Sequence, residues 1–158
     1  MRRVDRAVTD NRQIQSIIEK AKVVHIGMID NDLPYVVPMQ YGFIFNEGKL
    51  TLYVHCAKKG RKLNIINKNP HVFIELETEA VIISGGEVPC EYGSEYASVM
   101  GDGTAIFVED VKEKILGLQL LMKTQTGIDF EITEPMTKQV TVLRIDVPCV
   151  TAKSRAKA

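Results

Sequence analysis

The densest group of side chains that could bind a ligand lies in residues 53–63. Four cations crowd this segment: Lys58, Lys59, Arg61 and Lys62. Residues 61–67 are predicted to form a short helix, so these charges lie at or just before a helix N-terminus. The helix dipole already places positive charge there, which makes the arrangement unfavourable unless an anion neutralises it. Free N–H groups of the first turn, beside Gly60, would form a phosphate site.

This basic segment has two interpretations, and both stay open on the residues alone. In the first, Arg61 binds a phosphate through two parallel hydrogen bonds, and Lys62 or Lys58 adds a point charge. In the second, the segment is a solvated loop, because runs of charge usually lie on protein surfaces.

Residues 34–43 form a second candidate ligand-facing segment. They belong to a predicted strand that Pro34 and Pro38 interrupt. Proline cannot donate a hydrogen bond to a β-ladder, so we expect an edge strand or a bulge near Pro38. A planar heteroaromatic ring could partner the free backbone groups, with Met39 and Tyr41 as packing surface. An edge strand exposed to water explains the two prolines equally well.

Residues 90–103 form a third candidate segment, rich in small and hydroxyl-bearing side chains that would allow a ligand to come close. The alternative is a bent strand that needs Gly101 and Gly103 for its geometry. The acidic residues between positions 75 and 95 follow at irregular spacing, so they predict no paired-carboxylate site.

The three histidines, His25, His55 and His71, have no metal-like spacing, and we predict no metal site. We expect His25 to be a structural histidine within a strand and His71 to start a strand at the surface. His55 either contacts a cofactor or makes a structural hydrogen bond. The three cysteines include no CxxC pair and are expected to be reduced, as in a cytosolic protein.

The elements that must position these residues are mostly strands. Five to six strands, two clear helices and one short helix are predicted, and the early hairpin-like run favours an antiparallel sheet that curls into a barrel. Asp10 with Gln13 and Asp110 with Glu113 are predicted to cap the two clear helices. We expect one domain over residues 1–158, with a solvated end after Thr151.

Composition excludes several classes of protein. The 158 residues are 45% hydrophobic and 25% charged, and 20 basic residues balance 20 acidic ones. The balance argues against nucleic-acid binding, which usually requires a basic surface. The basic N-terminus lacks a following apolar run, and no stretch reaches the length of a membrane span. We therefore expect a cytoplasmic protein that does not bind membranes.

Taken in order, several segments resemble the nitroimidazole-resistance group of the pyridoxamine 5'-phosphate oxidase-like family, the FMN-binding split barrels. They are Pro34-Tyr35-Val36-Val37-Pro38, Leu52-Tyr53-Val54-His55, Ala57 with Gly60-Arg61-Lys62, and Tyr96-Ala97-Ser98-Val99 with Gly103. The opening Met1-Arg2-Arg3 with Asp5-Arg6 and the closing Thr151-Ala152-Lys153 are similar too. The resemblance implies a mainly β fold, a six-stranded antiparallel split β-barrel with flanking helices, and a homodimer with FMN at the subunit interface.

The resemblance also implies a set of cofactor-binding residues. Pro38, Met39, Gln40 and Tyr41 would line the flavin ring, flanked by His55, Cys56 and Ala57. Gly60, Arg61 and Lys62 would hold the FMN phosphate, Ser98 and Val99 would complete the site, and Lys153 is a further contact. His55 is the candidate catalytic residue.

The implied activity is that of an FMN-dependent oxidoreductase. Electrons would pass from NADH or NADPH to a small acceptor such as a nitroaromatic compound of the 5-nitroimidazole type. The chain has no tryptophan, which argues against a true pyridoxamine-phosphate oxidase. The alternatives are a non-catalytic flavin- or haem-binding protein for storage or sensing, and a dimeric interaction module with an empty site. Residues 79–91 match the family less clearly and predict nothing about the substrate side.

Overall fold

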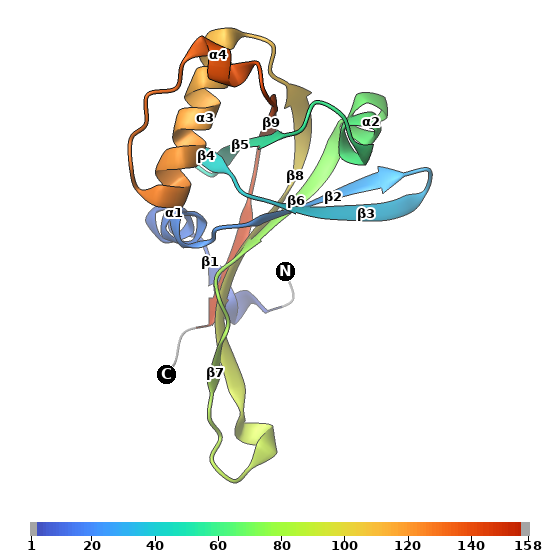
Figure 1. Cartoon of the computed structure of the whole chain (residues 1–158). Coiled ribbons are helices and arrows are strands. Elements are labelled where there is room, and N and C mark those ends of the chain that lie inside the picture. Colours follow the sequence, from blue (N-terminus) through green and yellow to red (C-terminus); the bar gives the residue numbers. More distant parts are fainter. Residues whose placement is uncertain (1–2, 156–158) are drawn as a thin grey trace.

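The predicted strands form an antiparallel, split β-barrel in the computed structural model, which describes residues 3–155 (Figure 1). The helices are α1 (Asn11–Lys20), α2 (Arg61–Lys68), α3 (Val111–Thr126) and α4 (Glu134–Thr137), with 3-10 turns η1 (Val4–Arg6) and η2 (Pro89–Glu91). The strands are β1 (Ala7–Val8), β2 (Val24–Asp30), β3 (Leu33–Met39), β4 (Gly42–Asn46), β5 (Lys49–Cys56), β6 (His71–Glu77), β7 (Val81–Ile83), β8 (Gly93–Phe107), β9 (Thr141–Val147) and β10 (Thr151–Arg155). The mainly β fold class is confirmed.

Seven strands pair in the order β3-β2-β6-β8-β9-β5-β4. The two end strands, β3 and β4, are separated in the chain only by Gln40 and Tyr41. Three Cα–Cα steps cover at most about 11 Å, so the sheet must curl until its edges come close. The opening between β3 and β4 is the split of the barrel. The two prolines of β3 therefore lie on an edge strand, as predicted.

β8 holds the sheet together. Its first residues pair with β7, its middle pairs with β6 and β10, and its end pairs with β9. Gly101 in this strand allows close packing, because an added Cβ would lie 2.6 Å from Cγ1 of Val147 and 2.8 Å from the carbonyl oxygen of Cys149. The glycine is needed for this approach of the β9–β10 connection.

Alternate residues of the strands fill the barrel core. Its fully buried members include Ile26, Leu52, Ile74, Leu76, Val99, Leu143 and Ile145. One face of α1, with Ile14, Ile17 and Ile18, packs against them. The Asp10 side chain accepts hydrogen bonds from the backbone N–H groups of Arg12 and Gln13, so the predicted cap of α1 is confirmed.

α3 is fixed against β4 and β5. A Cβ on Gly117 would lie 2.6 Å from the Tyr53 ring, so the helix can approach only because this position is glycine. The Tyr53 hydroxyl donates to Glu113 over 3.2 Å, and Arg144 donates to the same carboxylate over 2.7 Å. Asp110 accepts from the Glu113 backbone N–H, as predicted. Within residues 3–155 no helix combines the length and apolar character needed to span a membrane.

Three predictions need correction. The structure has ten strands where five to six were expected, because the short strands β1, β7 and β10 flank the seven that pair in sequence across the sheet. A solvated end was expected after Thr151, but residues 151–155 form β10, which pairs with β8 on one side and β1 on the other, and Ala152 is buried; residues 156–158 lie outside the described residues. α4 is a fourth helix where three were expected.

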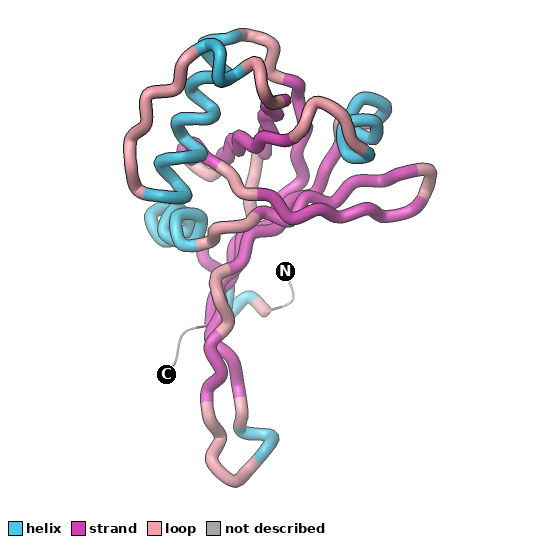
Figure 2. The backbone as a smooth tube through the Cα atoms, viewed as in Figure 1, coloured by secondary structure: helices cyan, strands magenta, loops and turns pink. Residues whose placement is uncertain are grey.

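The hairpin formed by β7, η2 and the start of β8 projects away from the rest of the described chain (Figures 1 and 2). It includes the segment whose family likeness was weakest. β7 pairs with β8 alone in the part of the chain that is described.

Candidate functional site

The N-terminus of α2 follows directly from the end of β5 and carries the predicted basic segment. Gly60 is its N-cap residue and provides no side chain, and the first turn contains no acidic residue. The φ of Gly60 is 157°, in a backbone region that glycine enters far more readily than other residues. Nothing lies within 4 Å of where a Cβ would be. The protein therefore leaves the N–H groups at this helix end without a side-chain cap and with open space beside them.

Arg61 is held by the β2–β3 hairpin. Its Nε donates to Oδ2 of Asp30 over 2.8 Å, and its guanidinium carbon lies 4.3 Å from the centre of the Tyr35 ring. The two terminal nitrogens make no hydrogen bond to residues 3–155. The side chain is 57% exposed, so the guanidinium is oriented by the protein while its terminal N–H groups stay accessible.

The lysines of the segment have no acidic partner in residues 3–155. Lys58, Lys59 and Lys62 form no ion pair within the described residues. Cys56, at the end of β5, is half-buried; burial raises the pKa of its thiol, and the nearby Lys62 partly offsets that effect. The positive charge of Lys62 therefore acts on the neighbouring Cys56 thiol.

The predicted residues include neighbours along a strand, such as Pro38 and Met39 or His55 and Cys56. The two members of such a pair point to opposite faces of the sheet. Met39, Cys56 and Val99 turn toward the barrel core, whereas Pro38 and His55 are exposed. The His55 ring makes no side-chain hydrogen bond to any described residue, so no structural bond of this kind holds it.

Tyr41 is a further correction, because its side chain was expected to be packing surface for a ring. It is fully buried, and its hydroxyl lies 2.6 Å from the carbonyl oxygen of Ile18 and 2.7 Å from that of Ala21. Its own carbonyl accepts from the Gln125 side chain. Burial raises the pKa of Tyr41. Tyr41 ties the barrel edge to α1 and α3, a role that depends on residues far away in the sequence.

Other predicted residues lie on the outer face of the sheet. His25 is opposite Pro38 on one side and Glu75 on the other, while Ser98 lies opposite both Glu77 and Lys153. Residues directly opposite each other share a face of the sheet. The Lys153 ammonium also lies 5.6 Å from the centre of the Tyr96 ring.

His25 belongs to a group that spacing in the sequence could not reveal. Its Nδ1 lies 3.3 Å from Oε2 of Glu75, and one ligand atom from each of His25, Glu75 and Glu77 lies within 4.8 Å of the others. Burial and the neighbouring Glu77 raise the pKa of Glu75. The prediction of a structural histidine in a strand fits the contact with Glu75.

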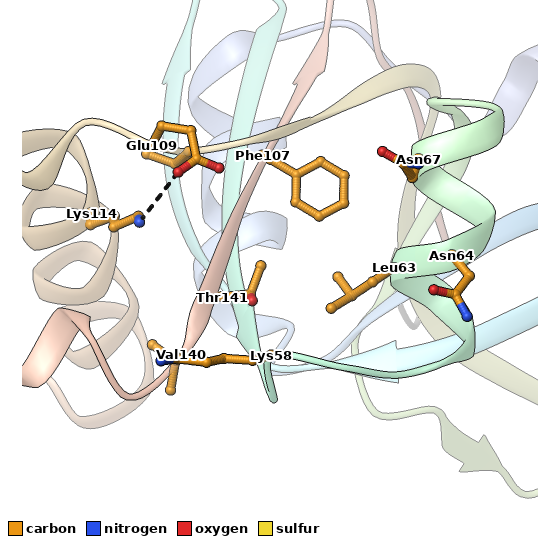
Figure 3. Close-up of a pocket in the computed structure, with 10 residues that line it drawn as sticks. Lys58, Leu63, Asn64, Asn67, Phe107, Glu109, Lys114, Val140 and Thr141 are labelled. Atoms are coloured by element: carbon orange, nitrogen blue, oxygen red, sulfur yellow. Dashed lines mark ion pairs between the residues drawn. The ribbon is translucent and has the colours of Figure 1, made fainter.

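A hollow of about 460 Å³ opens between α2, α3 and the start of β9 (Figure 3). Polar and apolar side chains both line it; the residues drawn include Lys58, Leu63, Asn64, Asn67, Phe107, Glu109, Lys114, Val140 and Thr141. Lys114 and Glu109, which both line the hollow, form an ion pair over 3.9 Å. Lys58 is the one predicted basic residue that reaches it.

The structure therefore gathers the predicted residues into two groups. Ala57, Gly60, Arg61 and Lys62 lie near the tip of the β2–β3 hairpin, because Arg61 contacts Asp30. Pro38, Ser98 and Lys153 lie around His25, five residues back along β2, or about 17 Å away at the rise of a strand. Gln40 lies in the short link between β3 and β4 and is exposed.

Comparisons with known proteins identify the family of the chain. The profile of the pyridoxamine 5'-phosphate oxidase family matches residues 10–154. A candidate 5-nitroimidazole antibiotic resistance protein from Bacteroides thetaiotaomicron has a similar structure, with 30% identity, a TM-score of 0.79, and coverage of 94% of this chain and 86% of that one. A search of curated proteins gives no match.

Two more distant structures share the fold. The flavocytochrome Anf3 from Azotobacter vinelandii is 16% identical, with a TM-score of 0.75 over 99% of this chain and 72% of that one. An FAD-binding protein from Mesorhizobium loti is 18% identical, with a TM-score of 0.64 over 96% of this chain and 98% of that one. With the match over residues 10–154, these results show that the chain belongs to the pyridoxamine 5'-phosphate oxidase family.

Proposed function

We propose that this protein binds FMN through its phosphate at the N-terminus of α2 and acts as an oxidoreductase. The observation that carries the proposal is that several cations gather at this helix end without anionic groups to neutralise them. Arg61 and three lysines gather there, the lysines have no acidic partner among the described residues, and no side chain caps the helix. A phosphate monoester carries nearly two negative charges and accepts several hydrogen bonds, so it satisfies both needs.

The residues present fit the phosphate in detail. Gly60 leaves room for close approach, and Arg61 is already oriented by Asp30 and Tyr35 with its terminal nitrogens free. Lys62, in the first turn of the helix, adds positive charge beside Arg61. A pre-oriented guanidinium loses less conformational freedom when it binds, which favours affinity.

The bound flavin would supply the redox chemistry, taking a hydride from a nicotinamide donor and passing electrons to a small acceptor. The protein's part is to bind, orient and shield. Of the residues predicted to lie near the ring, Pro38 and His55 are exposed, and Ser98 and Lys153 lie opposite each other on the outer face of the sheet. We propose a nitroaromatic compound as acceptor, since a relative at 30% identity is described by 5-nitroimidazole resistance.

We also propose a homodimer with FMN at the subunit interface. The outer face of β2, β3 and β6 supports this proposal, because it leaves Ile29, Val36 and Phe73 about half exposed. Contiguous exposed apolar surface of this kind typically marks an interaction site.

The test is the visible absorption spectrum of the purified protein before and after addition of FMN, followed by NADH, NADPH and a nitroimidazole in turn. We expect flavin bands that bleach with one nicotinamide and return with the nitro compound. Flavin that binds but resists both nicotinamides would contradict the reductase activity and leave a carrier. A protein that does not bind FMN at all would overturn the proposed function.

A further inference from the structure

The projecting hairpin, residues 79–95, is here called the arm. No residue of the arm is buried, and its exposed side chains include Val81, Ile82, Val88 and Tyr92. Ile82 is 69% exposed, which is unusual for isoleucine. A two-stranded hairpin without a covering layer is at best marginally stable in water. The arm therefore presents an apolar surface that another surface must cover.

The tip of the arm is nevertheless well shaped. The Tyr92 hydroxyl donates to the carbonyl oxygen of Gly86 over 3.1 Å. A Cβ on Gly85 would lie 2.6 Å from the backbone of Glu91 and Tyr92, so the two sides of the tip touch. The arm is thus a preformed element, and its apolar side chains are held in place before anything covers them.

The charge of the arm identifies what could cover it. The arm contains four glutamates, Glu79, Glu87, Glu91 and Glu95, and no lysine, arginine or histidine. The segment 58–62 contains four cations and no acid. The arm and the segment 58–62 therefore carry formal charges of equal size and opposite sign.

Within one chain these two segments cannot meet. The arm joins β8 at Gly93, whereas α2 leads into β6 at His71, which lies opposite Thr104 of β8. Gly93 and Thr104 are eleven residue steps apart along the strand, or about 37 Å. Figure 1 shows the arm and α2 at opposite ends of the sheet. The arm can therefore meet the segment 58–62 only on a second copy.

An apolar surface suited to the arm lies beside the basic segment. A hollow of about 310 Å³ on the outer sheet face is lined by residues that include Ile29, Pro34, Val36 and Phe73. It reaches Asn69, one residue beyond α2. The tip of the same hairpin contacts Arg61 through Asp30. Apolar and basic surfaces thus lie side by side, as the arm requires.

We propose that the arm of one copy lies across the outer sheet face of a second copy. Ile82 and Tyr92 cover the apolar hollow, and Glu87 and Glu91 lie toward the partner's Lys58 and Lys59, which leaves Arg61 and Lys62 to the phosphate. A twofold axis makes the contact reciprocal, since each copy has both surfaces. The part that concerns chemistry rests on the proposed function: the arm forms the acceptor-side wall of the partner's flavin site.

The first test is a charge swap with two variants. One carries Glu87→Lys and Glu91→Lys, and the other carries Lys58→Glu and Lys59→Glu. In a homodimer of either variant, both contacts bring like charges together. We therefore expect the dimer dissociation constant of each variant to be at least tenfold higher than that of the wild type. Mixed together, they restore opposite charges at both contacts. We expect a heterodimer by native mass spectrometry; its failure to form from folded variants would overturn the proposal.

The second test needs no substitution. A zero-length reagent that joins carboxylates to lysine amines is applied to an equal mixture of light and heavy isotope-labelled wild-type protein, in the presence and absence of FMN. We expect mixed-label peptides that join Glu87 or Glu91 to Lys58 or Lys59. The pair Lys138 and Glu134, 2.9 Å apart in one chain, is the internal control. The control link without any mixed-label arm link would overturn the proposal.

These outcomes separate the two proposals. Arm links in a protein that binds no FMN would support the docking of the arm and overturn the proposed function and the acceptor wall. FMN binding without arm links or heterodimers would leave the flavin site standing and overturn the arm contact.

Discussion

α2 and α3 each begin shortly after a strand of the same sheet, yet their N-termini are built in opposite ways. α3 starts with Asp110, whose carboxylate accepts from the Glu113 backbone N–H over 2.8 Å. α2 starts with Gly60, has no side-chain cap and is surrounded by cations. The N–H groups at the start of α3 have an acceptor within the protein. Those at the start of α2 have no side-chain acceptor and are suited to bind an external anion.

The surroundings of the two helix ends repeat the contrast. Glu113 in the first turn of α3 is used inside the fold, where it accepts from Tyr53 and Arg144. Arg61 in the first turn of α2 is oriented by Asp30 but keeps its terminal nitrogens free. At the helix end that stabilises the fold, the charged side chain is bonded to other residues of the protein. At the helix end proposed to bind a ligand, the charged side chain keeps donors free.

The largest expected effect comes from removing the charges of α2. Arg61→Ala with Lys62→Ala should weaken FMN binding by about 3–6 kcal/mol, since a hydrogen bond to a charged group contributes about 1.5–3 kcal/mol. Isothermal titration calorimetry would measure this as a rise in Kd of at least 100-fold. Lys112→Ala with Lys123→Ala on α3 is the matched control. Equal affinity in the two double variants would refute the phosphate assignment.

The next effect concerns the glycine of the N-cap. Gly60→Ala should lower the free energy of unfolding by about 1–3 kcal/mol, because alanine is strained at this φ. It should also weaken FMN binding about tenfold or more by moving the backbone N–H groups. Gly127→Ala, at the C-cap of α3 with φ 75°, should lose stability without losing FMN affinity. Urea denaturation and FMN titration of both variants check this, and a similar loss of affinity in both would contradict it.

A smaller effect is expected at the capped helix end. Asp110→Ala should lower the free energy of unfolding by about 1 kcal/mol, the usual contribution of an N-cap, and should leave the Kd for FMN unchanged. Asp110→Asn retains a capping oxygen and should recover most of the stability. A loss of FMN affinity in Asp110→Ala would break the distinction between the two helix ends.

The smallest effect is a reactivity of Cys56 that reports on α2. Burial raises the pKa of Cys56, so iodoacetamide should alkylate it several-fold more slowly than the exposed Cys90 and Cys149 at pH 8. Bound FMN should slow Cys56 further, because a phosphate offsets the opposing effect of Lys62. Peptide mass spectrometry over time would measure all three rates. An effect of FMN on Cys149 and not on Cys56 would argue against this location.

Local signals in the sequence predicted much of the fold. The caps at Asp10 and Asp110 act within three residues, and their hydrogen bonds form as expected. The prolines of β3 required an edge, and β3 is an edge strand. β10 could not be predicted, because its residues show no apolar alternation and its pairing with β8 and β1 depends on distant backbone.

The part of the candidate site that depends on residues close together in the sequence was also predictable. The basic segment is local in the sequence, and the structure keeps it together. Tyr41 was misjudged because its acceptors, Ile18 and Ala21, lie about 20 residues away and become neighbours only after folding. The pairing of Arg61 with Asp30 and the group around His25 likewise depend on tertiary contacts.

The most direct test of the central claim compares FMN with riboflavin, which has the same ring and ribityl chain but no phosphate. If the phosphate binds at the N-terminus of α2, FMN should bind at least 100-fold more tightly than riboflavin to the wild-type protein. The advantage should nearly vanish in the Arg61→Ala, Lys62→Ala variant. Equal affinity of the wild-type protein for the two flavins would contradict the account.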